Sequence, residues 1–147
     1  MGKIDVVVQK LSADSVVPKY AHEGDAGVDL YSAGNFTVKP GERVLVPTGL
    51  KMAIPCGCEG QVRPKSGLAL KHGITVLNTP GTVDAPYRGE VGVIVINHDL
   101  RAAYEIKKGE KIAQMVFNKV EHVTFTEAGE LEATTRGEGG YGSTGKK

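Results

Sequence analysis

The sequence predicts an all-β fold, and three features of its pattern agree on this. Apolar residues alternate with polar ones over short runs, which is the period of a strand with one buried face. Turn residues recur about every ten positions, as they do in sandwiches and barrels. Only residues 66–71 have the pattern of a helical turn. The 147 residues correspond to a single domain that can bury a core without metals or disulfides.

The strands expected in the first half of the chain are short. Residues 4–8 alternate apolar and polar side chains, and Phe36 and Val38 lie in a short expected strand that Pro40-Gly41 closes. Two further strands are expected at 44–46 and 50–54, because Pro47-Thr48-Gly49 is a typical turn sequence. The only two cysteines, Cys56 and Cys58, are one residue apart, which is poor geometry for a disulfide, and we expect free thiols.

In the second half, the apolar runs are longer. Residues 91–96 are continuously apolar, which predicts a buried strand. Residues 112–120 and 123–125 are expected to form the last two strands.

Charge and hydropathy exclude several classes of protein. Lys and Arg number 18 against 17 Asp and Glu, a net charge of +1, which lacks the basic footprint of a nucleic-acid binder. No apolar run approaches the ~18 residues of a membrane span. The first residues lack the apolar stretch of a secretory signal. We therefore expect a cytoplasmic protein with reduced thiols that binds neither nucleic acid nor membrane.

The composition changes at Arg136, which suggests a folded part, 1–135, and a glycine-rich mobile arm, 136–147. Glycines allow backbone N–H groups to converge on an anion, and Arg136 offers a fork that matches phosphate. Ser143 and Thr144 add hydroxyl groups, and Tyr141 offers a flat face for a base. The arm is therefore a candidate to close over a nucleotide polyphosphate. The alternative is a frayed C-terminus.

Two nucleotide-binding motifs match the arm only formally. The pattern G-x-G-x-x-G occurs at 137–142 and again at 140–145, and 140–147 nearly spells a phosphate-binding P-loop. Both motifs need a helix after them, and the chain stops instead. Lys147 also stands where a P-loop has Ser or Thr.

Two segments in the first half carry candidate polar chemistry. Asp25 and Asp29 flank Gly27, either as solvated charges of a turn or as carboxylates that hold magnesium-bound water. Arg63, Lys65, Ser66 and Gly67 precede the expected helical turn, where free N–H groups bind anions.

Two more candidate segments lie further along. Asn78 precedes a Pro-Gly turn, and Asp84 lies between Val83 and Ala85, where partial desolvation suits a general base. The alternative for 78–89 is a β-hairpin with a capping Asp. Gln114 is a polar residue in the apolar run of 109–115, and such residues often face outward.

Five stretches of the chain resemble the trimeric dUTPase family in their order and spacing. They are 25–30, 63–68, 78–89, 109–115 and 136–145. The resemblance covers nearly the whole chain from Asp25 to Gly145. It implies a distorted jelly-roll subunit of the β-clip type and a homotrimer. Each active site would take the segments at Asp25, Lys65 and Gln114 from one chain, the 78–89 segment from a second and the arm from a third.

The resemblance also implies a reaction and a role for each site residue. Asp84 would orient and deprotonate a water that attacks the α-phosphorus of dUTP, giving dUMP and pyrophosphate. This keeps uracil out of DNA and supplies dUMP for thymidylate synthesis. Asp29 and Gln114 would contact Mg²⁺ through water only. The implied substrate-binding residues are Lys65, Ser66, Gly67, Asn78, Thr82, Val83, Tyr87, Gly92, Gln114, Arg136, Tyr141, Ser143 and Thr144.

Within the substrate set, Asn78 and the backbone near Gly92 resemble groups that read uracil, and Tyr87 resembles a residue stacked on deoxyribose. Lys65 stands where the family usually has Arg, so the charge is kept and the bidentate fork is lost. Tyr141 stands where Phe is common, and its ring can still stack on a base.

Two other functions are alternatives to dUTP hydrolysis, a deaminase on a related fold and a non-enzymatic protein on the same fold. A dCTP deaminase would need a Glu as proton shuttle where this chain has Ile94, and an Ile cannot move a proton. A non-enzymatic nucleotide-binding protein would be favoured by loss of Asp84 or of the arm, and both are present. Incubation with dUTP and magnesium distinguishes the three.

Overall fold

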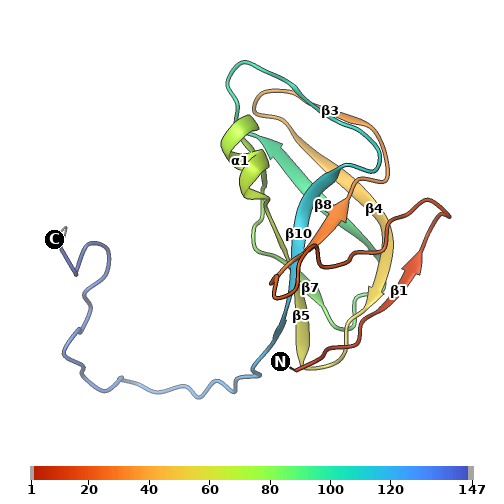
Figure 1. Ribbon diagram of the computed structural model, residues 1–147. Coiled ribbons are helices and arrows are strands. Elements are labelled where there is room, and N and C mark those ends of the chain that lie inside the picture. The colour runs from red at the N-terminus through yellow and green to blue at the C-terminus, as the bar shows by residue number, and fades with distance from the viewer. Residues whose placement is uncertain (1, 146–147) are drawn as a thin grey trace.

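The computed structural model describes residues 2–145, and in that range it contains ten strands and one short helix (Figure 1). In chain order these are β1 (Val7–Lys10), β2 (Val28–Tyr31), β3 (Phe36–Val38), β4 (Arg43–Ala53), β5 (Cys58–Arg63), α1 (Ser66–His72), β6 (Ile74–Val76), β7 (Gly81–Asp84), β8 (Glu90–Asn97), β9 (Tyr104–Ile106) and β10 (Lys111–Lys119). The prediction of an all-β fold is confirmed, as is the helical turn after Lys65.

Two antiparallel four-stranded sheets enclose the core. One has the order β1-β4-β8-β6, the other β2-β10-β5-β7, and β3 pairs with β9 in a small third sheet. One cluster of buried apolar side chains joins the two large sheets, with Val93 and Val95 on the first and Leu30 and Met115 on the second. All four of these side chains are fully buried, and their burial is the main source of stability.

The two strands expected at 44–46 and 50–54 form one strand, β4. Its pairing with β8 shifts register between Pro47 and Lys51, so the turn sequence is absorbed as an irregularity within the ladder. Gly49 adopts a left-handed φ of 71° there. The Thr48 hydroxyl, which is buried, donates to the Val91 carbonyl at 2.6 Å and fastens the irregular stretch to β8.

Three other predictions about strands need correction. The first strand begins at Val7 rather than at residue 4. Residues 123–125 are not a strand, because no neighbouring strand pairs with them, and Val123 and Phe125 are exposed. β8 has one fully buried face, Val91, Val93 and Val95, while alternate residues are half-buried, so its continuous apolar run does not mean burial on both faces.

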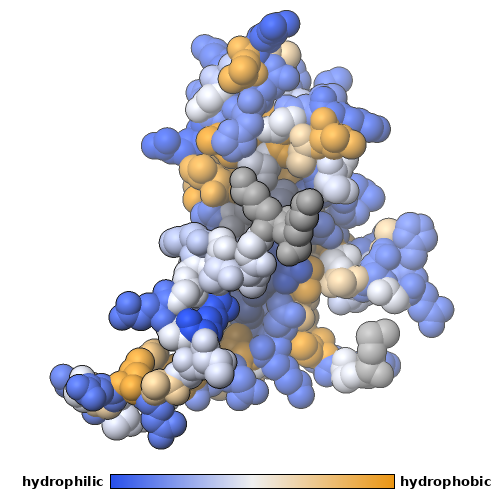
Figure 2. Space-filling model, turned by 90° about the vertical axis from the view of Figure 1, so that its left-hand side faces the viewer, coloured by the Kyte–Doolittle hydropathy of each residue, from blue (hydrophilic) through white to orange (hydrophobic). Residues whose placement is uncertain are grey.

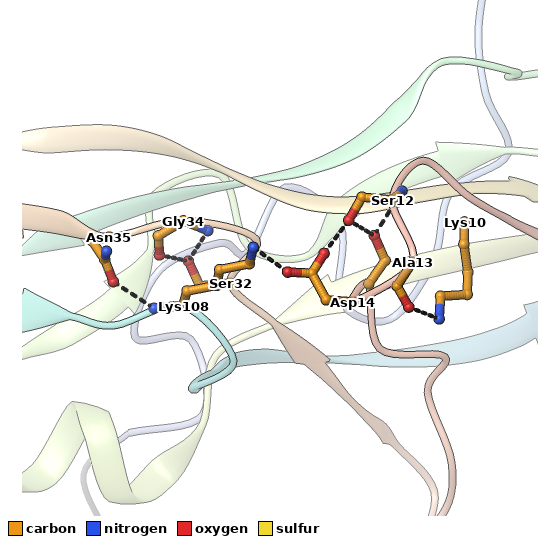
Figure 3. Close-up of polar contacts among 9 residues, drawn as sticks. Lys10, Ser12, Ala13, Asp14, Ser32, Gly34, Asn35 and Lys108 are labelled. Atoms are coloured by element: carbon orange, nitrogen blue, oxygen red, sulfur yellow. Dashed lines mark hydrogen bonds and ion pairs between the residues drawn. The ribbon is translucent and has the colours of Figure 1, made fainter.

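Polar contacts fasten the loop after β1 to the turn before β10 (Figure 3). The Lys108 ammonium pairs with the Asp14 carboxylate, which also accepts from the Ser12 hydroxyl. The Lys108 backbone N–H donates to Asn35 Oδ1 at 2.8 Å. Hydrogen bonds from Lys108 and Ser12 lower the pKa of Asp14 to about 2.

The chain leaves the body after β10. Residues 120–145 have no helix or strand and are almost entirely exposed (Figure 1). Seen from the side of this segment, the surface is mostly hydrophilic, and its hydrophobic residues form separate small groups (Figure 2). The Arg136 boundary drawn from composition therefore falls inside an extended segment that starts earlier. Among residues 2–145, no helix is long and apolar enough to cross a membrane.

Candidate active site

Two adjoining cavities lie where the chain passes from β7 to β8. The larger has a volume of 190 Å³ and the smaller 60 Å³, and Thr82, Val83 and Gly92 line both. The hairpin considered for 78–89 does not form, because β7 pairs with β5 whereas β8 pairs with β4 and β6. The segment instead crosses from one sheet to the other, and the cavities lie at that crossing.

Asp84 ends β7 and lines the larger cavity. Alternation along the strand turns Val83 inward and leaves Asp84 exposed. The desolvation expected from Val83 and Ala85 is therefore absent in the single chain. β7 instead determines the position of the Asp84 carboxylate, because Asp84 pairs with Glu59 of β5 and its backbone is fixed there.

Tyr87 is held at the rim of the larger cavity by two features of its turn. Its hydroxyl donates to the Glu90 carbonyl at 3.0 Å. Its ring lies over Gly89, where a Cβ atom would be 2.3 Å from the Tyr87 oxygen. Only glycine at position 89 leaves room for the ring, so the sequence of this turn determines the place of Tyr87.

The smaller cavity has apolar walls on part of its lining and an amide at its edge. Val62, Val76 and Ile94 contribute apolar walls. Asn78 lies beside Gly81, where a Cβ atom would be 3.2 Å from the Asn78 Nδ2 atom. Gly92 contributes no side chain, so the backbone of β8 is accessible from the cavity. Such a pocket suits a flat ring with polar edges.

A charged cluster forms a second group of candidate residues. The Asp29 carboxylate is largely buried, and its Oδ1 atom accepts from the Lys65 ammonium while Oδ2 lies 2.7 Å from Lys111 Nζ. Burial alone would raise the pKa of Asp29, but hydrogen bonds from Lys111 and Lys65 outweigh it and hold that pKa below its ordinary value. Asp29 is therefore ionised at neutral pH.

Lys111 was not among the residues selected from the sequence. Its position depends on an irregularity in the pairing of β10 with β2, between Lys111 and Ala113. No residue type in the sequence marks that irregularity.

Gln114 lies beside this cluster on the same sheet. It pairs with Asp29 on β2 and with Arg63 on β5, and its side chain is half-buried. Its Nε2 atom donates to the Pro64 carbonyl at 2.9 Å. A Cβ atom on Gly27 would lie 2.5 Å from Oε1, so glycine at 27 leaves this oxygen its place.

The remaining candidates near this cluster are at its edge. Ser66 and Gly67 are exposed and begin α1, directly after Lys65. Asp25 has the role of a turn residue, because its carboxylate accepts from the backbone N–H of His22 at 2.9 Å.

The number and type of possible ligand atoms determine how this site could bind a magnesium ion. Within residues 2–145, no group of three or more His, Cys, Asp or Glu side chains forms a cage for a metal. Asp29 and the Gln114 Oε1 atom nevertheless offer the oxygen donors that Mg²⁺ prefers. Because Mg²⁺ keeps much of its water, these residues fit an ion that they contact through water.

The arm residues are not brought to either group within one chain. Arg136, Tyr141, Ser143 and Thr144 are exposed on the extended segment, which points away from the sheets (Figure 1). The Arg136 Nε atom donates to the Gly139 carbonyl at 2.9 Å, which is a local turn. Lys147, which excluded a P-loop, lies outside the described residues.

The cysteines and Ile94 agree with what the sequence predicts. Cys56 and Cys58 are free thiols. Ile94 lines the smaller cavity, so the position that would carry a deaminase's Glu carries no ionisable group.

Comparison with known proteins identifies the family. The family model described as dUTPase matches residues 13–145. A Clostridium kluyveri protein named deoxyuridine 5′-triphosphate nucleotidohydrolase is 53% identical over 142 residues, which cover 97% of this chain and 99% of that protein. A protein of the same name from Fusobacterium nucleatum is 58% identical over 132 residues, covering 88% and 90%.

A solved structure gives the same answer. The dUTPase of Staphylococcus bacteriophage 80alpha, solved with dUpNHpp, matches with a TM-score of 0.88 and 27% identity over 96% of this chain and 98% of its own. Fold, sequence and the order of the five stretches agree. The chain therefore belongs to the dUTPase family.

Proposed function

We propose that this protein hydrolyses dUTP to dUMP and pyrophosphate by attack of water on the α-phosphorus. The observation that carries the proposal is the convergence of Asp84, Tyr87, Asn78 and Gly92 on two adjoining cavities. A separate cationic cluster lies around Asp29. Membership of the dUTPase family supports the choice of substrate, as does the phage enzyme with bound dUpNHpp.

The smaller cavity selects the base. Uracil enters between the apolar walls, and the Asn78 amide together with the backbone near Gly92 reads its polar edge. The walls leave no room for a thymine methyl group. Tyr87 stacks on the deoxyribose and opposes a 2′-hydroxyl, since the hydrogen bond to Glu90 holds the ring in place. Thr82 and Val83 form the floor that both cavities share.

Asp84 acts as the general base. Its carboxylate takes a proton from a water molecule, the oxygen of that water forms a bond to the α-phosphorus, and the bond from that phosphorus to the bridging oxygen breaks. The electron pair leaves with pyrophosphate. General-base catalysis of this kind contributes about 10²–10⁴-fold to rate.

The triphosphate is held by cations, hydroxyls and backbone groups from two parts of the chain. Lys65, Ser66, Gly67 and Gln114 come from the body, and Arg136, Ser143 and Thr144 from the arm. Asp29 and Gln114 would hold a Mg²⁺ ion through its water, and the bound ion would neutralise charge on the phosphates. Lys65 gives a point charge where an Arg would give a fork, so it depends more on its neighbours for position.

Assembly into a homotrimer with a distorted jelly-roll subunit completes the site. The 136–147 arm of one copy, with Tyr141 stacked on uracil, closes over cavities formed by others. This accounts for an arm whose phosphate-binding residues are exposed in the single chain. We place the protein in the cytoplasm, where it keeps uracil out of DNA and supplies dUMP.

The test is incubation with dUTP and Mg²⁺, with dUMP and pyrophosphate measured as products and the mass of the active species measured by light scattering. We expect equal amounts of both products and a trimer mass. Release of ammonia from dCTP would favour a deaminase instead. Binding of dUpNHpp without any turnover of dUTP would favour a binding protein. Loss of turnover in EDTA tests the role of the metal.

A further inference from the structure

The Asp29 carboxylate is held by two ammonium groups rather than one. Lys65 contacts Oδ1, and Lys111 Nζ lies 2.7 Å from Oδ2. Of the three side chains, Asp29 is the least exposed, at 13%, against 29% for Lys65 and 48% for Lys111. Lys111 thus reaches from the surface to a carboxylate that is largely shielded from water, and the same contact raises the pKa of Lys111.

A β-bulge is responsible for this contact. Residues three apart on a regular strand face opposite sides, so Lys111 and Gln114 would lie on different faces of β10. The pairing with β2 instead shifts register between Lys111 and Ala113, and both Ile112 and Ala113 are buried. Lys111 then pairs with Tyr31 and shares the outer face of the sheet with Asp29 and Gln114. Bulges of this kind often re-aim a side chain beside an active site.

The charges show what the second lysine adds. With Lys65 alone, Asp29 forms a neutral pair, and the ammonium that should meet a phosphate is occupied by the carboxylate. With Lys111 present, two positive charges and one negative charge leave a net charge of +1. Removing Lys111 would therefore bring the net charge of the cluster to zero and weaken its attraction for an incoming triphosphate.

We infer that Lys111 is a positioning residue for the substrate triphosphate: it holds and neutralises Asp29, so that the positive charge of Lys65, which also contacts Asp29, remains available to phosphate. The inference rests on the proposed function, since it takes the Asp29 cluster as the triphosphate site. It differs from an ordinary surface ion pair, which would contribute little and would leave substrate binding unchanged.

The test compares Lys111→Met with Lys111→Arg, which keeps the charge, and with Lys107→Met. Lys107 is an exposed lysine of the preceding turn and serves as the matched control. We expect Lys111→Met to raise KM for dUTP about tenfold with kcat changed much less, the size expected for a lost charged contact. Lys111→Arg should stay near wild type, and so should Lys107→Met. Calorimetric affinity for dUpNHpp, measured in EDTA and in Mg²⁺, should fall in parallel for Lys111→Met.

A double-mutant cycle with Asp29→Asn shows whether Lys111 acts through Asp29. In that background, Lys111→Met should change dUpNHpp affinity far less than in the wild type, because no carboxylate remains to be neutralised. An undiminished effect would overturn the inference and make Lys111 a direct phosphate ligand.

Three controls separate the other outcomes. If Lys111→Met and Lys107→Met have the same affinity and KM, the inference is wrong although dUTP hydrolysis stands. If the wild type does not hydrolyse dUTP, the proposed function fails first. Circular dichroism and light scattering of each variant exclude misfolding, and Lys111→Gln replaces Lys111→Met if the latter misfolds.

Discussion

The two-sheet body and the C-terminal segment of this chain are built on different principles. In the body, candidate site residues are fixed by strands and by hydrogen bonds to the backbone, as Tyr87 is to Glu90 and Gln114 is to Pro64. After the Val120 N–H, which still donates to the Gly57 carbonyl, the backbone hydrogen bonds of residues 121–145 are those of local turns. Its large apolar side chains are almost fully exposed, Phe125 at 92% and Leu131 at 91%.

This difference separates stability from function. Within residues 2–145, none after Phe117 belongs to the buried core or packs against it, so we expect the body to fold without the segment. Under the proposed function the site needs this segment, because Arg136, Ser143 and Thr144, which are exposed in the single chain, would bind the triphosphate. Ordering a glycine-rich arm costs about 1–2 kcal/mol of backbone entropy per residue, so contacts with bound substrate have to offset that cost.

The largest effect should come from the body, through the carboxylate proposed as the general base. We expect Asp84→Asn to lower kcat by about 10²–10⁴-fold, because the amide cannot accept a proton from water. Affinity for dUpNHpp should be nearly unchanged. Steady-state kinetics and calorimetry measure the two quantities. Turnover within a few-fold of the wild type would remove Asp84 from the role of base.

Truncation after Thr135 should produce the next largest effect. We expect kcat/KM to fall by about 10²-fold, because under the proposed function the arm would position the triphosphate for in-line attack. Melting temperature and trimer mass should be little changed. Limited proteolysis offers an independent check, since the arm should be cleaved readily in free protein and slowly with dUpNHpp bound. A truncated protein of normal efficiency would make the arm a frayed end.

A pair of large-to-small substitutions tests the same contrast in stability. Leu30 is fully buried between the sheets, and Leu30→Ala should lower the free energy of unfolding by about 2–5 kcal/mol. Tyr141 is fully exposed, and Tyr141→Ala should change it by less than about 0.5 kcal/mol. Denaturant titration measures both, and similar values would mean that the arm contributes to the fold of the body.

The smallest effect should be on specificity. Tyr87→Ala removes the ring that Gly89 accommodates, so a 2′-hydroxyl should meet less steric opposition. We expect the preference for dUTP over UTP to fall by about tenfold. An unchanged ratio of kcat/KM values for the two nucleotides would show that Tyr87 does not exclude ribose.

Sequence reasoning worked where a local pattern determines the outcome. The apolar runs at 91–96 and 112–120 predicted much of β8 and most of β10, and the glycine-rich composition from Arg136 indicated a segment that does not pack. It failed where the pairing between two strands determines the local structure. Pro47-Thr48-Gly49 looked like a turn between strands, but the neighbouring β8 absorbs it as an irregularity.

The candidate site shows the same division. The cavity residues follow from the order of the five stretches. Lys111, however, depends on a register shift between β10 and β2, and such a shift is set by two strands together rather than by either sequence. The exposure of Asp84 was also missed, because Val83 and Ala85 as sequence neighbours do not tell which way the carboxylate points.

The central claim is that body and arm of different copies form one site, and mixed trimers test it most directly. Chains truncated after Thr135 keep Asp84 but lack the arm, and full-length Asp84→Asn chains keep the arm but lack the base. Each preparation alone should be nearly inactive. If the two are dissociated and reassembled in equal amounts, sites that pair an intact Asp84 with a neighbour's arm should restore about a quarter of wild-type turnover. A mixture no more active than its components would mean that base and arm must come from one chain, and the account would be wrong.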